Sequence, residues 1–454
     1  MTTVGLVSLG CAKNQVDSEV MLGHLRRRGF EITHHPSRAD VLVVNTCGFL
    51  EASKEESYAT IREMGELKRK GRLRRLVVAG CLVQRSADAM RADLPEVDQF
   101  IALNDVERIA EACDPDSGPF EADRGEATWL PTVDSPRLLT SPGPSAYVKI
   151  SEGCDNPCAF CVIPQIRGRF RSRPAASLVA EARALSEAGV RELNLIAQDS
   201  TSYGDDLGES GSLPGLLRAL GAVEGIRWVR LLYAYPNRMT TELMDTLGGA
   251  RGVLPYLDVP LQHAARAALA RMRRGGSRAS FTRMIEELRR RVPALSLRTT
   301  FIVGFPGETE EEFEDLRSFV QEIEFDHIGV FTYSHEPGAP SHTMADDVPA
   351  SLKSDRRQVL LDLQEGIAEK LYRARIGSSV EVLVEGPGPE KGTRSGRAAF
   401  QAPEVDGDVV VHGVTARDGF ATVRIDDAAA YRLVGVAEGA PAFVPKRPSL
   451  RVVS

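Results

Sequence analysis

The sequence of 454 residues lacks the features that would place it in a membrane or outside the cell. No apolar run approaches the 18 or more residues that a membrane-spanning helix needs. The N-terminal stretch that ends at Cys11 is apolar, but no basic residue precedes it, so we do not interpret it as a signal peptide. We therefore expect a soluble cytoplasmic protein without membrane association, in which seven cysteines, an odd number, do not form a disulfide framework.

The sequence also lacks an excess of positive charge. It has 63 acidic and 56 basic residues, a net charge of −7. A generic nucleic-acid binder usually carries a basic field, so this balance argues against that class and is compatible with a basic protein partner. The length indicates two to four domains, and the fractions of hydrophobic (43%) and charged (26%) residues are those of a globular protein.

Three cysteines, Cys154, Cys158 and Cys161, lie within eight residues, directly after the apolar run 146–150. Thiolates this close together on one loop can bind a single iron–sulfur cluster. A [4Fe–4S] cube normally takes four cysteines, and no fourth lies nearby, so one iron would remain open to another molecule. A zinc site is the alternative, although zinc usually takes two separated cysteine pairs or one pair with distant histidines.

Residues 1–118 have the pattern of an α/β domain, with short apolar runs at 4–9, 41–44 and 76–79 that are typical of buried parallel strands. Each run ends at a cysteine: Cys11, Cys47 and Cys81. Ligands of open parallel sheets bind at the carboxyl ends of the strands, so these cysteines predict a second iron–sulfur site. The alternative is three buried structural cysteines. Cys113 lacks this context, and we do not expect it to be a ligand.

The rest of the chain divides by composition and periodicity. Residues 119–144 are rich in Pro, Gly, Ser and Asp and predict a linker. Residues 145–374 alternate strand and helix patterns, which favours parallel strands with outer helices, and 350–373 predicts one amphipathic helix. Residues 375–445 predict a small β-barrel. The strands expected in the central region are 147–151, 192–197, 227–232, 257–261, 297–303 and 327–333.

With Phe160 as its aromatic residue, the cysteine loop resembles the C-x-x-x-C-x-aromatic-C signature of the radical S-adenosylmethionine (SAM) superfamily. The stretch 8–19, with 45–47 and 79–81, resembles the N-terminal domain of the methylthiotransferases, and 396–407 resembles their TRAM domain. The resemblance implies an N-terminal parallel α/β sheet domain, a partial (β/α)6 radical-SAM barrel and a small all-β TRAM barrel. Together these motifs cover nearly the whole chain in the family's order.

The family resemblance also implies the cofactors. It implies SAM and two [4Fe–4S] clusters, one held by Cys154, Cys158 and Cys161 and the other by Cys11, Cys47 and Cys81. Reductive cleavage of SAM would give a 5′-deoxyadenosyl radical that abstracts a hydrogen, a route suited to a C–H bond without an acidic proton. The residues we expect to contact SAM are Phe160, Gln198, Asp199, Arg298 and Gly304.

Three of these features have a second interpretation. Gly304 and Gly307 also fit a tight turn before a helix that starts near residue 309. The arginine run 167–173 is either a solvated face or a source of guanidinium groups for the SAM carboxylate or a substrate acid. His263 is more often structural in such a context, and we expect only that it lies in the pocket.

Within the family, the stretches 12–15, 197–203 and 258–263 resemble the branch that places a methylthio group on the β-carbon of an aspartate in small-subunit ribosomal protein twelve. The implied partners are that protein and a reductant of flavodoxin or ferredoxin type. Residues 375–454 contain ten basic and ten acidic residues, so nucleic-acid binding is doubtful, and we expect the small β domain to contact the protein substrate through an exposed strand edge.

Two other functions stay open at this point. One is a tRNA methylthiotransferase that acts on a modified adenosine, which needs a basic TRAM surface. The other is a non-catalytic iron–sulfur or zinc protein that serves as a redox sensor or scaffold.

Overall fold

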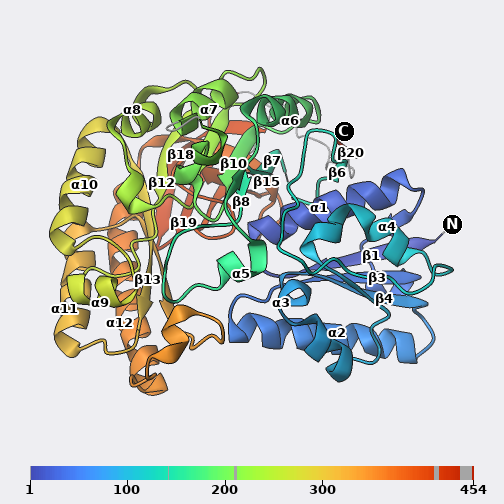
Figure 1. Cartoon of the computed structure of the whole chain (residues 1–454). Helices are drawn as coiled ribbons and strands as arrows, with labels where there is room; N and C mark the ends of the chain where they lie inside the picture. Colours follow the sequence, from blue (N-terminus) through green and yellow to red (C-terminus); the bar gives the residue numbers. More distant parts are fainter. Residues whose placement is uncertain (1, 142, 209–211, 414–418, 440–451, 454) are drawn as a thin grey trace.

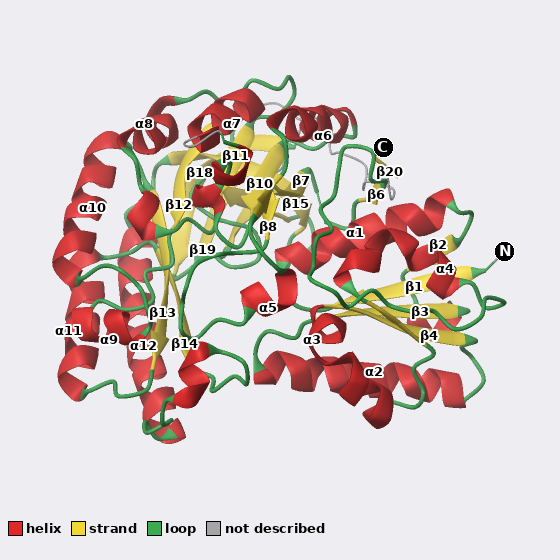
Figure 2. Ribbon diagram, viewed as in Figure 1, coloured by secondary structure: helices red, strands yellow, loops and turns green. Residues whose placement is uncertain are grey.

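The structure is a computed structural model that describes residues 2–141, 143–208, 212–413, 419–439 and 452–453 (Figures 1 and 2). An N-terminal α/β unit lies beside a central sheet with outer helices, and a small β-barrel packs behind that sheet. No helix among the described residues is both long enough and apolar enough to cross a bilayer.

The N-terminal unit is a five-stranded parallel sheet in the order β2-β1-β3-β4-β5. Its elements are β1 (Thr3–Ser8), α1 (Ala12–Arg27), β2 (Glu31–Thr33), β3 (Val41–Thr46), α2 (Glu51–Arg69), β4 (Arg75–Gly80), α3 (Cys81–Asp93), β5 (Gln99–Ile101) and α4 (Ile109–Cys113). Helices α1 and α4 cover one face and α2 and α3 the other (Figure 2). Strands β3 and β4 are buried on both faces, which explains their continuous apolar runs.

The central unit is a six-stranded parallel sheet in the order β14-β13-β12-β11-β10-β7. Its strands are β7 (Ser145–Lys149), β10 (Glu192–Ile196), β11 (Trp228–Leu231), β12 (Val253–Asp258), β13 (Ser296–Val303) and β14 (His327–Thr332). Its helices are α5 (Ile163–Arg167), α6 (Ala175–Glu187), α7 (Ser212–Gly221), α8 (Thr241–Gly249), α9 (Arg266–Arg271), α10 (Arg278–Arg291), α11 (Glu310–Ile323) and α12 (Ala350–Arg373). The short strands β6 (Arg137–Leu138) and β20 (Val452–Val453) pair with each other.

One expected strand is misplaced. The sequence indicates a strand at 257–261, whereas β12 runs Val253–Asp258. Pro255 lies inside this strand. Because proline cannot donate to a β ladder, its presence argues against a strand at this position when the sequence alone is considered. The sheet accommodates Pro255 at a register shift, where Val229 pairs with Val253 but Leu231 pairs with Leu257.

The C-terminal unit is a closed barrel in the order β15-β16-β17-β19-β18. Its strands are β15 (Ser379–Pro387), β16 (Arg394–Ala398), β17 (Asp408–His412), β18 (Phe420–Ala429) and β19 (Arg432–Ala437). The single helix predicted at 350–373 is confirmed as α12, which leads into this barrel. We expected a substrate to dock on an exposed strand edge of this domain, and for the described residues this expectation is wrong. The barrel closes by pairing β15 with β18, so every barrel strand has two neighbours.

Buried ion pairs join the three units. Glu192, on β10, pairs with Arg230 of β11 and Arg397 of β16, which fixes the barrel against the central sheet. Arg137, in the segment between α4 and β7, pairs with Glu19 of α1 and Glu181 of α6. The N-terminal and central units are therefore held together by charges that lie out of contact with water.

Candidate functional site

The three N-terminal cysteines lie at one end of the parallel sheet, as the sequence predicts. Cys11 caps α1 after β1, Cys47 directly follows β3, and Cys81 directly follows β4. These strands are neighbours, and the thiols are close enough that Cys11 and Cys47 both influence the pKa of Cys81. Gly10 permits the approach, because a Cβ at that position would lie 2.9 Å from Cys47 Cβ.

Asn14 holds this arrangement together from the first turn of α1. Its amide Nδ2 donates to the carbonyl of Leu9 at 3.0 Å and to that of Thr46 at 2.9 Å, which joins the ends of β1 and β3. Its Oδ1 lies 3.4 Å from Cys81 Sγ and accepts from that thiol. One buried side chain thus fixes the segments that carry all three cysteines.

The second group, Cys154, Cys158 and Cys161, lies on a loop at the carboxyl end of β7, where ligands of such sheets bind. The strands β8 (Ser151–Glu152) and β9 (Arg171–Ser172) pair antiparallel and so bring together the two ends of the segment that carries these cysteines. The Ala159 N–H donates to the Met272 carbonyl at 2.9 Å, and its own carbonyl accepts from Ser341 at 2.8 Å. The loop is therefore anchored from several sides of the central unit.

Arg167, the last residue of α5, connects the two groups. Its Nη2 donates to Cys81 Sγ at 3.2 Å, to Asn14 Oδ1 at 2.6 Å and to Asp17 Oδ2 at 3.1 Å. Its Nη1 donates to Glu152 Oε2 at 2.7 Å, two residues before Cys154. The guanidinium is buried, so these hydrogen bonds form away from water.

Neither interpretation of the arginine run holds for its two buried members. Arg167 and Arg173 are not solvated, and their guanidinium groups bind protein carboxylates instead of facing a ligand. Arg173 pairs with Glu181 at 2.5 Å. Arg169, by contrast, is solvent-exposed.

The residues predicted to contact SAM fall in two places. Gln198 Nε2 donates to Glu152 Oε1 at 2.5 Å, and Asp199 accepts from Asn156 of the cysteine loop at 2.7 Å. Both therefore support the loop directly. Arg298 lies near the start of β13 and pairs with Asp406 of the C-terminal barrel at 2.5 Å. Its contact with SAM stays a prediction.

Phe160 and the segment at Gly304 come together. Phe160 packs against a cluster that includes Phe305, Tyr333 and Met272. Gly304 has φ +72°, the left-handed region that favours glycine, and its N–H donates to Glu308 Oε2 at 2.7 Å. The tight-turn interpretation of Gly304 is confirmed, and the turn lies beside the cysteine loop.

His263, expected in the pocket, is fully buried. Its Nδ1 accepts from the Ala265 N–H at 3.0 Å, and its Nε2 lies 3.7 Å from Glu308 Oε2. This is the structural role that a lone histidine more often has.

The donor chemistry fits iron–sulfur clusters. Burial raises the pKa of Cys81 and of Cys161 to about 12 and also raises the pKa of Cys47 and Cys154, so these thiols are protonated at neutral pH until iron displaces the proton. Among the described residues, no group of three or more His, Cys, Asp and Glu side chains could hold a metal ion as they stand.

Sequence reasoning missed several residues of the site. Arg274 Nη1 lies 3.5 Å from Cys158 Sγ and donates to it, with its guanidinium over the Tyr235 ring. Lys13 extends from the N-terminal unit so that Nζ lies 3.0 Å from the centroid of the Tyr233 ring. No spacing rule could identify these residues, because their partners are distant in sequence, and Lys13 meets Tyr233 only where two units pack.

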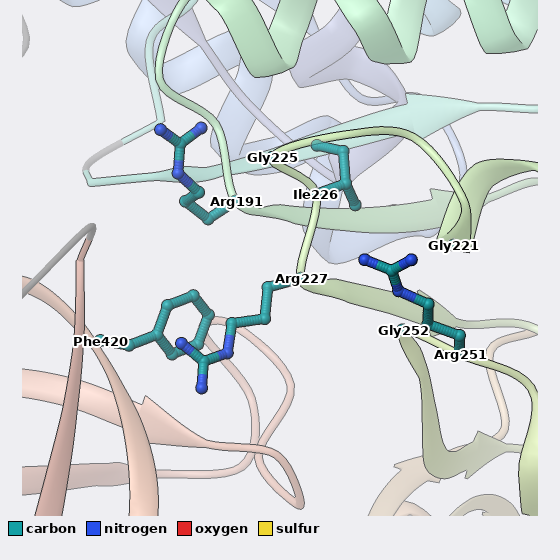
Figure 3. A pocket seen from close by; sticks show the side chains of 8 residues that line it. All are labelled: Arg191, Gly221, Gly225, Ile226, Arg227, Arg251, Gly252 and Phe420. Atoms are coloured by element: carbon teal, nitrogen blue, oxygen red, sulfur yellow. The ribbon is translucent and has the colours of Figure 1, made fainter.

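A hollow of about 450 Å³ lies elsewhere, at the amino ends of β10 to β12. Figure 3 shows the side chains of Arg191, Arg227 and Arg251 around it, with Phe420 of the C-terminal barrel on the facing side. None of the predicted site residues lines this hollow, and the cysteine loop is at the opposite, carboxyl end of the sheet.

Comparisons with known proteins agree with this architecture. Family models match in order: the uncharacterized protein family UPF0004 at residues 3–102, the radical SAM superfamily at 148–320 and the TRAM domain at 376–437. Among solved structures, the radical SAM methyltransferase TsrM from Kitasatospora setae has a TM-score of 0.54 and 15% identity, and the match covers 73% of each chain. This likeness establishes the fold alone.

Curated relatives match along nearly the entire chain. Ribosomal protein uS12 methylthiotransferase RimO from Solibacter usitatus (strain Ellin6076) is 45% identical, with 98% of each chain covered. The protein of the same name from Anaeromyxobacter sp. (strain K) is 47% identical, with 96% of this chain and 93% of the relative covered. The chain therefore belongs to the ribosomal protein uS12 methylthiotransferase family of radical SAM enzymes.

Proposed function

We propose that this enzyme transfers a methylthio group to the β-carbon of an aspartate in ribosomal protein uS12, in the cytoplasm. The observation that carries the proposal is the pairing of two three-cysteine sites across a domain boundary, joined by Arg167. One site suits the activation of SAM, and the other suits the delivery of sulfur. The overall change replaces a C–H bond of the aspartate by a C–S bond that carries the methyl group.

The loop with Cys154, Cys158 and Cys161 would hold the cluster that binds SAM, and Cys11, Cys47 and Cys81 would hold the other. When bound, the first cluster and SAM would supply the radical chemistry that can remove a hydrogen from an unactivated carbon. The electron comes from an external reductant of flavodoxin or ferredoxin type.

The chain's own residues position these groups. Asp199 and Gln198 brace the cysteine loop through Asn156 and Glu152. Arg167 fixes the distance and orientation between the two sites, because it contacts Glu152 on one side and Cys81 on the other. Burial of this network excludes water from the boundary, which protects a radical from side reactions.

The substrate assignment rests on the relatives and on charge. The relatives act, by their names, on uS12. Ribosomal proteins are generally basic, and this chain has a net charge of −7, so complementary fields would steer the encounter and weaken with added salt.

The test offers the reconstituted enzyme and SAM two substrates separately: purified uS12 and bulk tRNA. Mass spectrometry then follows the gain of one methylthio group. We expect the gain on an aspartate of uS12 and none on tRNA. A methylthio gain on an adenosine, with uS12 unchanged, would refute the proposal in favour of a tRNA-modifying enzyme.

A further inference from the structure

Lys13 is a buried side chain whose ammonium contacts no carboxylate of the described residues directly. It lies in the first turn of α1, two residues after Cys11, and is 7% exposed. Its Nζ lies 3.0 Å from the centroid of the Tyr233 ring. In the part of the chain that the structure describes, its ammonium makes no ion pair within 4 Å and donates no hydrogen bond. Buried charges are normally paired, but the carboxylates of Asp258 and Glu152 act on this ammonium only from beyond ion-pair distance, so it has room for a direct anionic partner.

Tyr233 is held in an unusual conformation to make this contact. Its φ of +61° is left-handed, which is costly for a residue with a Cβ. Two backbone hydrogen bonds hold it there: the Tyr233 N–H donates to Asp258 Oδ2 at 3.2 Å, and its carbonyl accepts from Ser200 at 3.0 Å. Strain that is maintained by surrounding contacts is typical of functional sites.

Asp258 supplies a second unsatisfied group. It ends β12, and its Oδ1 is buried and accepts no hydrogen bond from any residue that the structure describes. The Nε of Arg298 lies 3.9 Å from this oxygen, which is beyond hydrogen-bond distance. The boundary thus offers an ammonium that needs an acceptor and a carboxylate oxygen that needs a donor.

Both groups lie between the two cysteine sites. Lys13 is two residues from Cys11 on one side. On the other side, Tyr235 follows Tyr233 by two residues and stacks with Arg274, which contacts Cys158. A molecule bound by Lys13 would therefore lie between the site that activates SAM and the site that delivers sulfur.

We propose that Lys13 binds the side-chain carboxylate of the aspartate to be modified, while Asp258 Oδ1 accepts a hydrogen bond from a peptide N–H of the same substrate segment. This inference rests on the proposed function and deepens it. An aspartyl residue in a peptide offers both complementary groups, a carboxylate and an N–H, whereas an adenosine base has no carboxylate. Lys13 thereby selects the substrate and orients its β-carbon, with the Tyr233 ring as a platform.

The variant Lys13→Met keeps the length and the helix propensity of the side chain and removes its charge. Binding of labelled uS12 to the cluster-loaded enzyme is measured by fluorescence anisotropy. We expect Lys13→Met to bind about 10- to 100-fold more weakly, as for a lost charge-assisted hydrogen bond. The matched control is Lys70→Met, at the exposed end of α2, which should bind as the unmodified enzyme does.

A second substrate, uS12 with the target aspartate changed to asparagine, completes a double-mutant cycle. We expect the unmodified enzyme to bind this substrate more weakly by the same factor. The Lys13→Met enzyme should bind it no more weakly than it binds native uS12. Iron content and thermal unfolding of the apoprotein show whether Lys13→Met is folded. The inference would be overturned if the two changes weakened binding independently, so that their factors multiplied. It would also be overturned if a folded Lys13→Met bound native uS12 with full affinity. If the unmodified enzyme fails to methylthiolate uS12 at all, the proposed function itself is wrong.

Discussion

Arg167 Nη2 donates a hydrogen bond to Cys81 Sγ at 3.2 Å, and the two residues belong to different structural units. The same guanidinium binds Glu152 beside the cysteine loop, so one side chain contacts the immediate surroundings of both cysteine groups. The relative position of the two sites thus depends on a few buried contacts at this boundary. Changes there should alter the N-terminal site without removing any cysteine.

Arg167→Gln should weaken the N-terminal site selectively. Among the described residues, the change leaves Asp17 and Glu152 with Lys149 as their one ion-pair partner, and we expect a loss of stability of about 3 kcal/mol. It also removes an N–H···S bond, and hydrogen bonds to the cysteine sulfur are among the factors that set cluster potential. Chemical unfolding measures the first effect, and an EPR-monitored redox titration measures the second.

The control for this prediction is Arg169→Gln, on the exposed side of the same loop, where the guanidinium is 79% exposed and lies 3.5 Å from Asp155. It should leave stability and potential unchanged. An unaltered N-terminal cluster in a folded Arg167→Gln protein would contradict the bridging role.

The two cysteine groups should be separable in function. Changing Cys11, Cys47 and Cys81 together to Ala should leave SAM cleavage intact and abolish methylthio transfer, because the site proposed to deliver sulfur is lost. Changing Cys154, Cys158 and Cys161 to Ala should abolish both. Iron analysis after anaerobic reconstitution should give about eight iron per unmodified chain and about four in each triple variant. Loss of SAM cleavage in the first variant, with four iron retained, would mean that the sites depend on each other.

The sequence predicts the architecture well because its signals are local. The runs that become β3 and β4 are continuous and apolar, and the cysteine loop carries its own spacing. Two short strands were not predicted: β2 and β5 have three residues each, too few for a periodic pattern. The start of β12 was missed for a different reason, because Pro255 argues against a strand there.

Residues that act across a domain boundary could not be predicted. Arg167 stands in a visible charge run, but its partners Asn14 and Asp17 lie about 150 residues earlier in the chain. Lys13 and Tyr233 meet only because two units pack together. Local periodicity contains no information about such contacts, whereas it specifies the strands that end at each cysteine.

His263 gives the protein a defined dependence on pH. Burial lowers the pKa of His263 to about 4, so the folded state keeps the imidazole neutral while the unfolded chain binds a proton below about 6.5. Stability should therefore fall as the pH decreases from 6.5 toward 4, by up to about 3 kcal/mol. His263→Asn retains an acceptor for the Ala265 N–H and removes this titration.

Chemical unfolding across this pH range measures the free energy of unfolding of His263→Asn and of the unmodified protein, and the difference between the two is then followed with pH. Glu308, whose pKa burial raises to about 7, titrates nearby with the opposite sign. Both proteins contain it, so most of its contribution cancels. A difference that does not vary with pH would show that His263 does not titrate as inferred.

The attachment of the C-terminal barrel to the central sheet should depend strongly on Glu192. Burial opposes ionisation of this carboxyl, but Arg397 and Arg230 outweigh it and hold the pKa of Glu192 at about 2. The stabilisation is present above pH 4.5 and is lost as the pH falls toward 2, because the folded state must then accept a proton. Glu192→Gln should leave two buried guanidinium groups without their shared carboxylate and cost about 3 to 5 kcal/mol at neutral pH.

Because Arg397 also pairs with Glu385 of its own barrel, the β-barrel should remain folded in Glu192→Gln while its contact with the central sheet loosens. Limited proteolysis should then cut the variant between α12 and β15 faster than the unmodified protein. Glu314→Gln, which removes an exposed pair with Arg317 on α11, serves as the control and should be cut at the unmodified rate. Equal cleavage of Glu192→Gln and the control would mean that the remaining contacts, such as the Arg298–Asp406 ion pair and the edge-to-face contact of Trp228 with Phe420, suffice to hold the barrel in place.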